Sequence, residues 1–246
     1  MKPRIGFFDF TGCEGCQLTV LNLEDQLLDL LELVDVVEFR EAITGSSEAL
    51  DIAFVEGSIT RQQDAERLAA IRAKSRYLVA LGACADMAGV NALRGEAGPD
   101  QLRREVYGSD AKHLLTFAPR PLSALVKVDG RIPGCPIDGQ EFLSVMQALI
   151  LDRQPELPSY PLCVECKLGE NACTFERGTV CLGPVVRAGC RAVCIEGGDR
   201  CRGCRGLVDH PRSSPYRRIL ESNGLSVDEI LAEFRTFNID EEGGEK

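Results

Sequence analysis

Hydrophobic positions in the first 150 residues alternate between two spacings. Short runs rich in β-branched and aromatic residues, typical of buried strands, are separated by longer stretches with helical spacing. The strand-like runs cover residues 4–10, 34–40, 51–57 and 77–82, with a further one near 125–130, and the helical stretches cover 17–33, 60–75 and 139–153. This alternation is typical of βαβ units and predicts an α/β fold with a flavodoxin-like, doubly wound parallel sheet.

The pattern changes near residue 155. Prolines in "DRQPELPSYP" interrupt the last helical stretch, and the chain beyond it is rich in cysteine, glycine and arginine with little hydrophobic periodicity. Such a stretch cannot build a core from side chains alone, so we expect bound metal to organise it. We therefore predict two domains, 1–155 and 156–246. The second ends in a short helix, where Ser226 and Glu229 form a capping-box pattern, and an acidic tail.

Composition excludes several classes of partner. The 246 residues are 44% hydrophobic, enough for a buried core, and carry 28 basic against 38 acidic side chains, a formal charge of -10. That charge repels phosphate backbones and anionic membranes. The sequence starts without a signal-peptide pattern, and charges break every apolar run before it could span a bilayer. We expect a cytoplasmic protein that binds no nucleic acid and has no membrane anchor.

The chain contains twelve cysteines. In a reducing compartment, closely spaced cysteines more often bind metal or carry redox chemistry than form disulfides. Four thiolates are the usual ligand set of an iron-sulfur cluster or a structural zinc ion, so twelve cysteines suggest three sites.

The first four cysteines each follow a predicted strand. The loops at the carboxyl ends of parallel strands converge on one crevice, so these sulfurs are expected to form one site. Taken singly, Cys84 could be a small buried hydrophobe and the Cys13/Cys16 pair a thioredoxin-type dithiol. The single-site interpretation is favoured because all four occupy the same position relative to a strand. They are Cys13, Cys16, Cys84 and Cys135.

The other eight cysteines fall within 42 positions. Their spacing fits two four-cysteine sites. It leaves open whether each site uses four consecutive cysteines or the two sites interleave, and whether the sites hold iron-sulfur clusters or zinc. The alternative function is accordingly a zinc-stabilised, non-catalytic scaffold. The eight are Cys163, Cys166, Cys173, Cys181, Cys190, Cys194, Cys201 and Cys204.

Several motifs together resemble the small, electron-transferring subunit of nickel-iron hydrogenases. They are "CEGC", "GACAD" and "PLSALVKVDGRIPGCPID" in the first domain and "CLGPVVRAGCRAVC" and "CRGC" in the second. The resemblance covers nearly the whole chain apart from the acidic tail. The related quinone-reductase subunit of respiratory complex I shares the fold but is marked by two adjacent cysteines, where this chain has "CEGC". That departure disfavours the complex I interpretation.

The resemblance implies a ligand set for each of three 4Fe-4S clusters. In membrane-bound uptake hydrogenases a histidine opens the distal motif and a proline stands in the medial one, but this chain has Cys163 and Cys194 there, so three complete 4Fe-4S clusters are expected. The proximal cluster would use Cys13, Cys16, Cys84 and Cys135, the medial cluster Cys190, Cys194, Cys201 and Cys204, and the distal cluster Cys163, Cys166, Cys173 and Cys181.

The resemblance also implies a reaction and partners. The reaction is reversible oxidation of hydrogen, with the chemistry on a large subunit that carries the nickel-iron centre, so this oxidoreductase subunit is expected to be inactive alone. The redox partner would be a flavin-containing, ferredoxin-like or heterodisulfide-reductase-type subunit. The missing export signal points to the soluble, cytoplasmic type of hydrogenase.

A few other polar residues are candidates for supporting roles. Glu14, between two proposed ligands, and Glu56, at a strand end, could lie beside the proximal cluster, although an exposed loop glutamate is the more ordinary interpretation of Glu14. His113 and His210 are each expected to be a satisfied or surface histidine. Arginines make the second domain locally basic. They are simply solvated, or they offset cluster charge, or they dock an acidic electron carrier. They include Arg187, Arg191, Arg200, Arg202 and Arg205.

Overall fold

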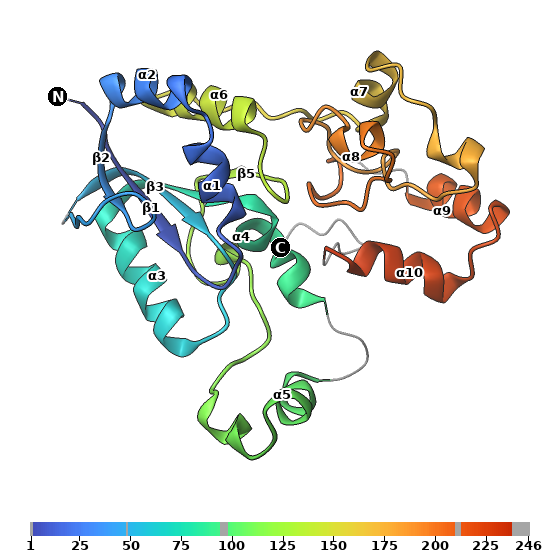
Figure 1. Ribbon diagram of the computed structural model, residues 1–246, viewed down its shortest axis with the longest axis horizontal. Coiled ribbons are helices and arrows are strands. Elements are labelled where there is room, and N and C mark those ends of the chain that lie inside the picture. The colour runs from blue at the N-terminus through green and yellow to red at the C-terminus, as the bar shows by residue number, and fades with distance from the viewer. Residues whose placement is uncertain (1, 48, 94–97, 210–212, 238–246) are drawn as a thin grey trace.

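A computed structural model describes residues 2–47, 49–93, 98–209 and 213–237, and its first half is built on a five-stranded parallel sheet (Figure 1). The strand order is β2-β1-β3-β4-β5, the doubly wound order of flavodoxin-like folds, which confirms the predicted fold class. The strands are β1 (Arg4–Asp9), β2 (Asp35–Phe39), β3 (Leu50–Glu56), β4 (Ser75–Leu81) and β5 (Gly130–Ile132).

Helices cover both faces of the sheet, so each face has its own apolar core. On one face, Phe7 and Phe54 from the sheet stack on each other and contact Phe142 of a covering helix. On the other face, Leu78 and Phe8 pack with Leu68. The covering helices are α1 (Gly15–Leu21), α2 (Asp25–Leu33) and α6 (Gly139–Ile150) on the first face and α3 (Gln62–Lys74) on the second (Figure 1).

Two predicted elements differ from the structure. The helical stretch predicted over 17–33 is two helices, because the chain turns between them and Glu24 has a positive φ of 51°. The last strand begins later than expected, at Gly130. Val126 and Val128 gave the strand-like pattern because they pack against the core from the preceding segment, without pairing in the sheet.

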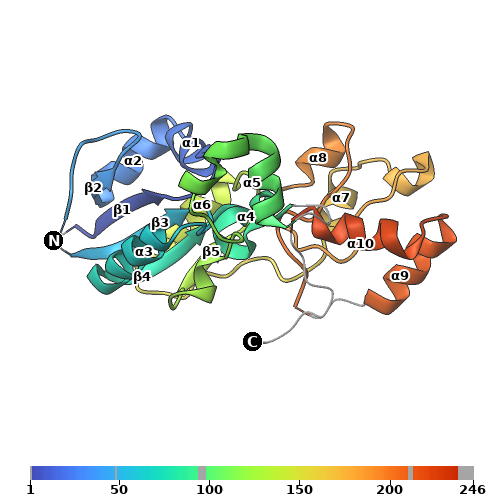
Figure 2. The same ribbon diagram turned by 90° about the horizontal axis from the view of Figure 1, so that it is seen from below.

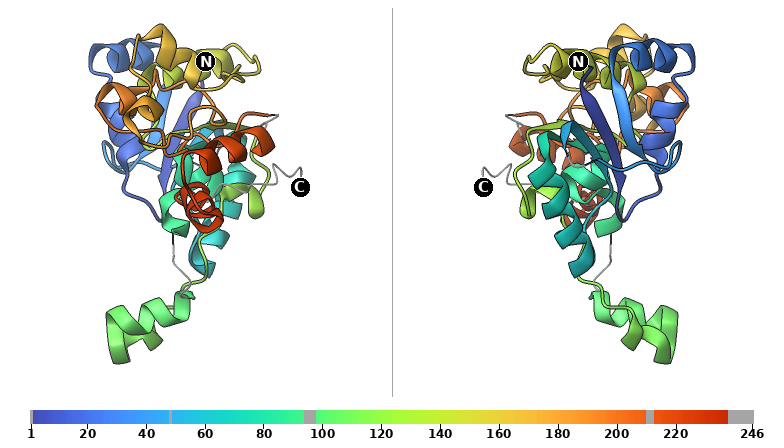
Figure 3. Two further views of the ribbon diagram at one scale, coloured as in Figure 1. Left: turned by 90° about the vertical axis from the view of Figure 1, so that its right-hand side faces the viewer. Right: turned by 90° about the vertical axis from the view of Figure 1, so that its left-hand side faces the viewer.

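A helical arm leaves the sheet domain between β4 and β5. After α4 (Gly82–Met87) and η1 (Gly89–Ala92), it consists of α5 (Pro99–Tyr107) and η2 (Gly108–His113), and η3 (Leu122–Ala124) returns the chain to the sheet. Figure 3 shows the arm projecting away from the sheet. His113 is exposed on it, as expected for a surface histidine.

The cysteine-rich second half lies beyond the carboxyl ends of the strands, away from the N-terminus (Figure 2). Its elements are short: α7 (Cys163–Leu168), η4 (Thr174–Arg177), α8 (Val193–Glu196), α9 (Ser213–Ser222) and α10 (Val227–Arg235). The capping box of Ser226 and Glu229 is present at the start of α10. His210 and the acidic tail lie outside the described residues, and the division at residue 155 stays a prediction. Within the part of the chain that is described, no helix is both long enough and apolar enough to cross a membrane.

Candidate metal centres

The four cysteines of the first domain meet at the carboxyl end of the sheet. Cys13 lies in the loop after β1 and Cys16 in the first turn of α1, while Cys84 lies in α4 after β4 and Cys135 in the loop after β5. Burial raises the pKa of Cys84 to about 11, and the nearby thiols of Cys135 and Cys13 raise it as well. The structure therefore brings together the sulfurs that the sequence placed in one set.

Glycine makes the close packing around these sulfurs possible. Gly82, with a φ of +84°, lies so close to Cys16 that a Cβ at this position would be 2.4 Å from the cysteine sulfur. A side chain is excluded there both by the backbone conformation and by the sulfur.

Glu56 holds the start of α1 in place beside this set. Its side chain is buried at the end of β3, and its two carboxylate oxygens accept hydrogen bonds from the backbone N–H groups of Cys16, at 3.1 Å, and Gln17, at 2.9 Å. Burial raises the pKa of Glu56, and the two amides act against that rise. A carboxylate at a helix N-terminus stabilises the first turn, and here that turn carries Cys16.

Glu14 has a weaker position. It is half-buried and has a positive φ of 61°, and its carbonyl accepts the first hydrogen bond of α1 from Leu18. Its backbone thus helps to start the helix between the two cysteines.

One group of four cysteines in the second half lines a cavity of about 80 Å³. The cavity wall includes Leu162, Phe175 and Ile195, and Gly183 lies between two of the sulfurs, where a Cβ would be 3.4 Å from each. The backbone N–H of Gly183 also donates to the Cys181 sulfur at 3.4 Å. The four cysteines are Cys163, Cys166, Cys173 and Cys181.

The remaining four cysteines line a separate cavity of about 180 Å³. Cys135 of the sheet domain borders it as well, as does Arg205. Leu162 and Ile195 line both cavities and so form the wall between them. The four are Cys190, Cys194, Cys201 and Cys204. Of the two groupings that spacing left open, this arrangement corresponds to the sequential one.

The donor sets fit iron-sulfur clusters. All twelve cysteines are free thiols, and among the described residues no three Cys, His, Asp or Glu side chains are close enough to hold a single metal ion. In the two sets of the second half the sulfurs surround a cavity, an arrangement that fits a four-iron centre held by four thiolates. Burial also raises the pKa of Cys163 to about 11 and that of Cys204 to about 12. Thiolates at such positions require bound cations.

The five arginines named above in the second half each form an ion pair within the chain. Arg187 and Arg205 are buried, and they pair with Asp209 and Glu141 respectively. These internal pairs favour compensation of charge inside the protein over docking of an acidic carrier. The other three pairs are Arg191 with Asp138, Arg200 with Glu233 and Arg202 with Asp199.

Comparisons with known proteins agree with this arrangement. Residues 13–149 match the family described as NADH ubiquinone oxidoreductase, 20 Kd subunit. The chain is 38% identical to the sulfhydrogenase 2 subunit delta of Pyrococcus furiosus, over 95% of this chain and 98% of the relative. A relative from Archaeoglobus profundus, 21% identical over 95% of this chain and 91% of its own length, is named as an iron-sulfur subunit of an F420-non-reducing hydrogenase.

A solved structure adds a likeness in three dimensions. A chain of the NAD⁺-reducing [NiFe]-hydrogenase in its H₂-reduced state is 29% identical and has a TM-score of 0.59, with 64% of this chain and 96% of that chain covered. The chain therefore belongs to the family of the NADH ubiquinone oxidoreductase 20 Kd subunit, and within it is a small subunit of the nickel-iron hydrogenase type.

Proposed function

We propose that this chain carries electrons, through three 4Fe-4S clusters, between the nickel-iron centre of a large subunit and a redox partner during reversible hydrogen oxidation. The observation that carries the proposal is the row of three four-cysteine sets. The set at the sheet end adjoins the 180 Å³ cavity through Cys135, and that cavity is separated from the third set by Leu162 and Ile195.

The order of the sets gives each a role. Cys13, Cys16, Cys84 and Cys135 hold the proximal cluster, the set from Cys190 to Cys204 the medial one, and the set from Cys163 to Cys181 the distal one. Each cluster, when bound, accepts and returns one electron. The protein fixes the sulfurs, surrounds them with apolar walls and donates backbone hydrogen bonds to them, which sets how readily each cluster is reduced. Hydrogen itself is split on the large subunit, so the chain alone has no hydrogenase activity.

The surface near the distal set supports contact with a redox partner. Leu168 and Val164 of α7 are exposed beside Cys163 and Cys166, and Cys173 is exposed as well. An apolar surface next to ligands suits docking of a flavin-containing, ferredoxin-like or heterodisulfide-reductase-type subunit. We place this assembly in the cytoplasm.

Metal analysis tests the proposal against a zinc-stabilised scaffold. Protein purified without oxygen is expected to contain about twelve iron atoms and as many acid-labile sulfides per chain. Stoichiometric zinc in a colourless protein would overturn the proposal.

Replacement of a single ligand tests the assignment of the proximal set. Cys13→Ser in the assembled enzyme should abolish hydrogen-dependent dye reduction, while most iron of the other two sets remains. Leu18→Ala, on the exposed side of α1, is the matched control and should retain activity. Full activity of the Cys13→Ser enzyme would contradict the assignment.

A further inference from the structure

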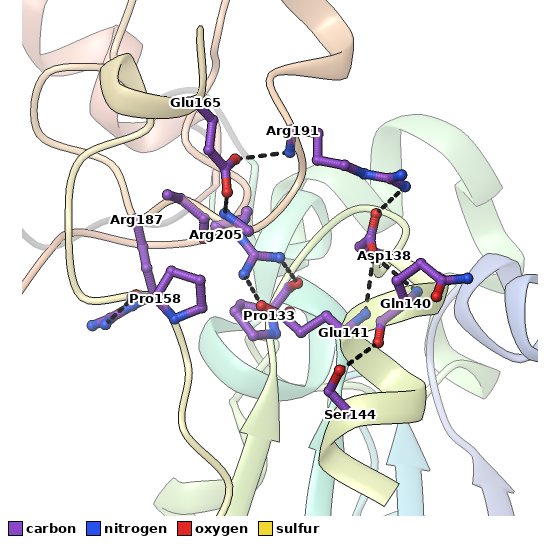
Figure 4. A network of polar contacts seen from close by, with 12 residues as sticks. Pro133, Asp138, Gln140, Glu141, Ser144, Pro158, Glu165, Arg187, Arg191 and Arg205 are labelled. Atoms are coloured by element: carbon purple, nitrogen blue, oxygen red, sulfur yellow. Dashed lines mark hydrogen bonds and ion pairs between the residues drawn. The ribbon is translucent and has the colours of Figure 1, made fainter. Parts of the chain in front are cut away.

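A buried ion pair lies where the sheet domain meets the medial cysteines (Figure 4). The Arg205 guanidinium donates to Glu141 of α6, with 2.6 Å between Nη2 and Oε1. The two side chains are only 1% and 9% exposed, so water screens their charges little. Their positions are 64 residues apart in the sequence, and the pair joins the two halves of the chain.

Arg205 also binds two loops that carry proposed ligands. Its Nη1 donates to the carbonyl of Pro133 at 2.6 Å, and its Nε donates to the carbonyl of Ala188 at 2.7 Å. Pro133 is two residues before Cys135, Ala188 is two residues before Cys190, and Arg205 itself follows Cys204. One guanidinium therefore connects a proximal ligand loop with two medial ones.

The proximal and medial sets meet at the cavity of about 180 Å³. Cys135 of the proximal set lines it together with the four medial cysteines, and Arg205 lines it as well. The loop of Cys135 that borders the medial set is thus the loop whose Pro133 carbonyl Arg205 holds.

Gly189 leaves the space that the ion pair fills. It has a φ of +116°, and a Cβ on it would be 2.2 Å from Arg205 Nη2 and 2.5 Å from Glu141 Oε1. A side chain at position 189 would therefore displace the pair without removing a charge, which makes it a separate test of geometry.

The charge of Arg205 lies beside the medial sulfurs, because Arg205 lines the same cavity as Cys190 and Cys204. Glu141 supplies the opposite charge, and its second oxygen, Oε2, is buried without a hydrogen-bond partner. Because reduction adds an electron, a nearby cation favours the reduced cluster and a nearby anion favours the oxidised one.

We propose that Arg205 is a positioning residue for electron transfer between the proximal and medial clusters, holding the loop of Cys135 beside the medial set and raising the medial reduction potential, with Glu141 as its counter-charge. The proposal rests on the proposed function. In the step itself one electron leaves the proximal cluster and enters the medial one, and no bond is made or broken.

Arg187 provides a matched control. It is also a buried arginine in an ion pair, and it donates to the carbonyls of Pro158 and Leu207 and to Asp209, none of which is a proposed ligand (Figure 4). Loss of Arg187 removes a buried guanidinium from two carbonyls, while its carboxylate partner Asp209 is 57% exposed and can be hydrated. Arg187→Met therefore controls for the removal of a buried guanidinium near the medial set. Of these two buried arginines, Arg205 is the one that contacts loops of both cysteine sets.

The experiment is a redox titration of the assembled enzyme followed by electron paramagnetic resonance. The medial signal is identified as the one altered in a Cys194→Ser variant. Arg205→Met should shift its midpoint to a more negative potential and Glu141→Gln to a more positive one, whereas Arg187→Met should leave it unchanged. In the fully reduced enzyme, Gly189→Ala should weaken the magnetic coupling between the proximal and medial clusters, because the pair no longer holds the two loops together.

Opposite shifts for the two charge variants support the proposal, since a merely structural disturbance would not reverse sign with the charge removed. Shifts in the same direction, or none, with wild-type iron content overturn it. If Arg205→Met loses iron, the sign of the Glu141→Gln shift decides alone: a positive shift supports the proposal, and no shift or a negative one overturns it. A wild-type enzyme without iron and sulfide would instead overturn the proposed function.

Discussion

The two halves of the chain use cysteine in different ways. In the sheet domain, phenylalanine and aliphatic side chains form the cores, and Cys16 is the one cysteine of the four that belongs to them. In the second half, Cys181 and Cys201 are themselves buried members of the core, among short helices. The proximal set therefore lies at the end of a sheet domain that has its own apolar cores, whereas the medial and distal sets make up a large part of the core of the second half.

The largest difference between the two halves is expected in hydrogen exchange after the removal of iron. After anaerobic chelation of the enzyme, backbone amides over residues 160–209 are expected to lose nearly all protection from hydrogen exchange, while those of β1, β3 and β4 keep theirs. The physical reason is that the second half would lose the metal proposed to join its cysteines, whereas the sheet would keep its apolar core. Equal loss of protection in both halves would remove the distinction.

The apolar core of the sheet gives the next largest effect. Phe54 is fully buried in β3, and Phe54→Ala should destabilise the sheet domain by about 3–5 kcal/mol through lost contacts and a cavity. Thermal unfolding followed by circular dichroism measures the change, and Leu33→Ala, at an exposed position of α2, serves as the control with almost no effect. A small loss for Phe54→Ala would mean that the clusters, not the core, hold this half together.

A smaller, pH-dependent effect is expected at Asp129. Its carboxylate accepts hydrogen bonds from Arg72 and from the Leu78 backbone, and these contacts lower its pKa although burial acts to raise it. Asp129→Asn should cost about 1–3 kcal/mol at pH 7. The pKa of Asp129 is lower in the folded than in the unfolded protein. Its contribution to the free energy of unfolding is therefore fully present above the pKa of the unfolded state, and it is lost as the pH falls through the pKa of the folded state.

Unfolding of the wild-type and Asp129→Asn proteins in denaturant at several pH values measures this difference. Asp152→Asn removes an exposed pair with Arg76 on the same domain and should change stability far less. A cost for Asp129→Asn that stays constant down to the lowest pH would exclude the ionised carboxylate as its source.

The sheet and its cysteine set could be predicted from the sequence because both follow local patterns. Each strand shows as an apolar run, and Cys13, Cys84 and Cys135 follow strands whose carboxyl ends must converge in a parallel sheet. The errors were local too: Val126 and Val128 contact the core without being in a strand, and Glu24 interrupts a helix whose apolar spacing continues through the turn.

The contacts between the halves could not be predicted in this way. Arg205 and Glu141 are 64 positions apart, and neither residue differs in sequence context from a solvated charge. The arm that contains α5 was missed as well, because its short helices carry exposed apolar residues such as Val106 without a buried face. Such features depend on which surfaces meet after folding, and hydrophobic periodicity does not record that.

Gly82 sets a limit on how this chain can diverge. With a sulfur where its side chain would begin, the position is expected to remain glycine in every functional member of a randomised library, while the exposed helix position Leu33 in α2 accepts many residues. Glycine at position 82 should therefore distinguish related sequences that retain the proximal thiol arrangement from those that retain only the fold. Related genes can be sorted by this one position.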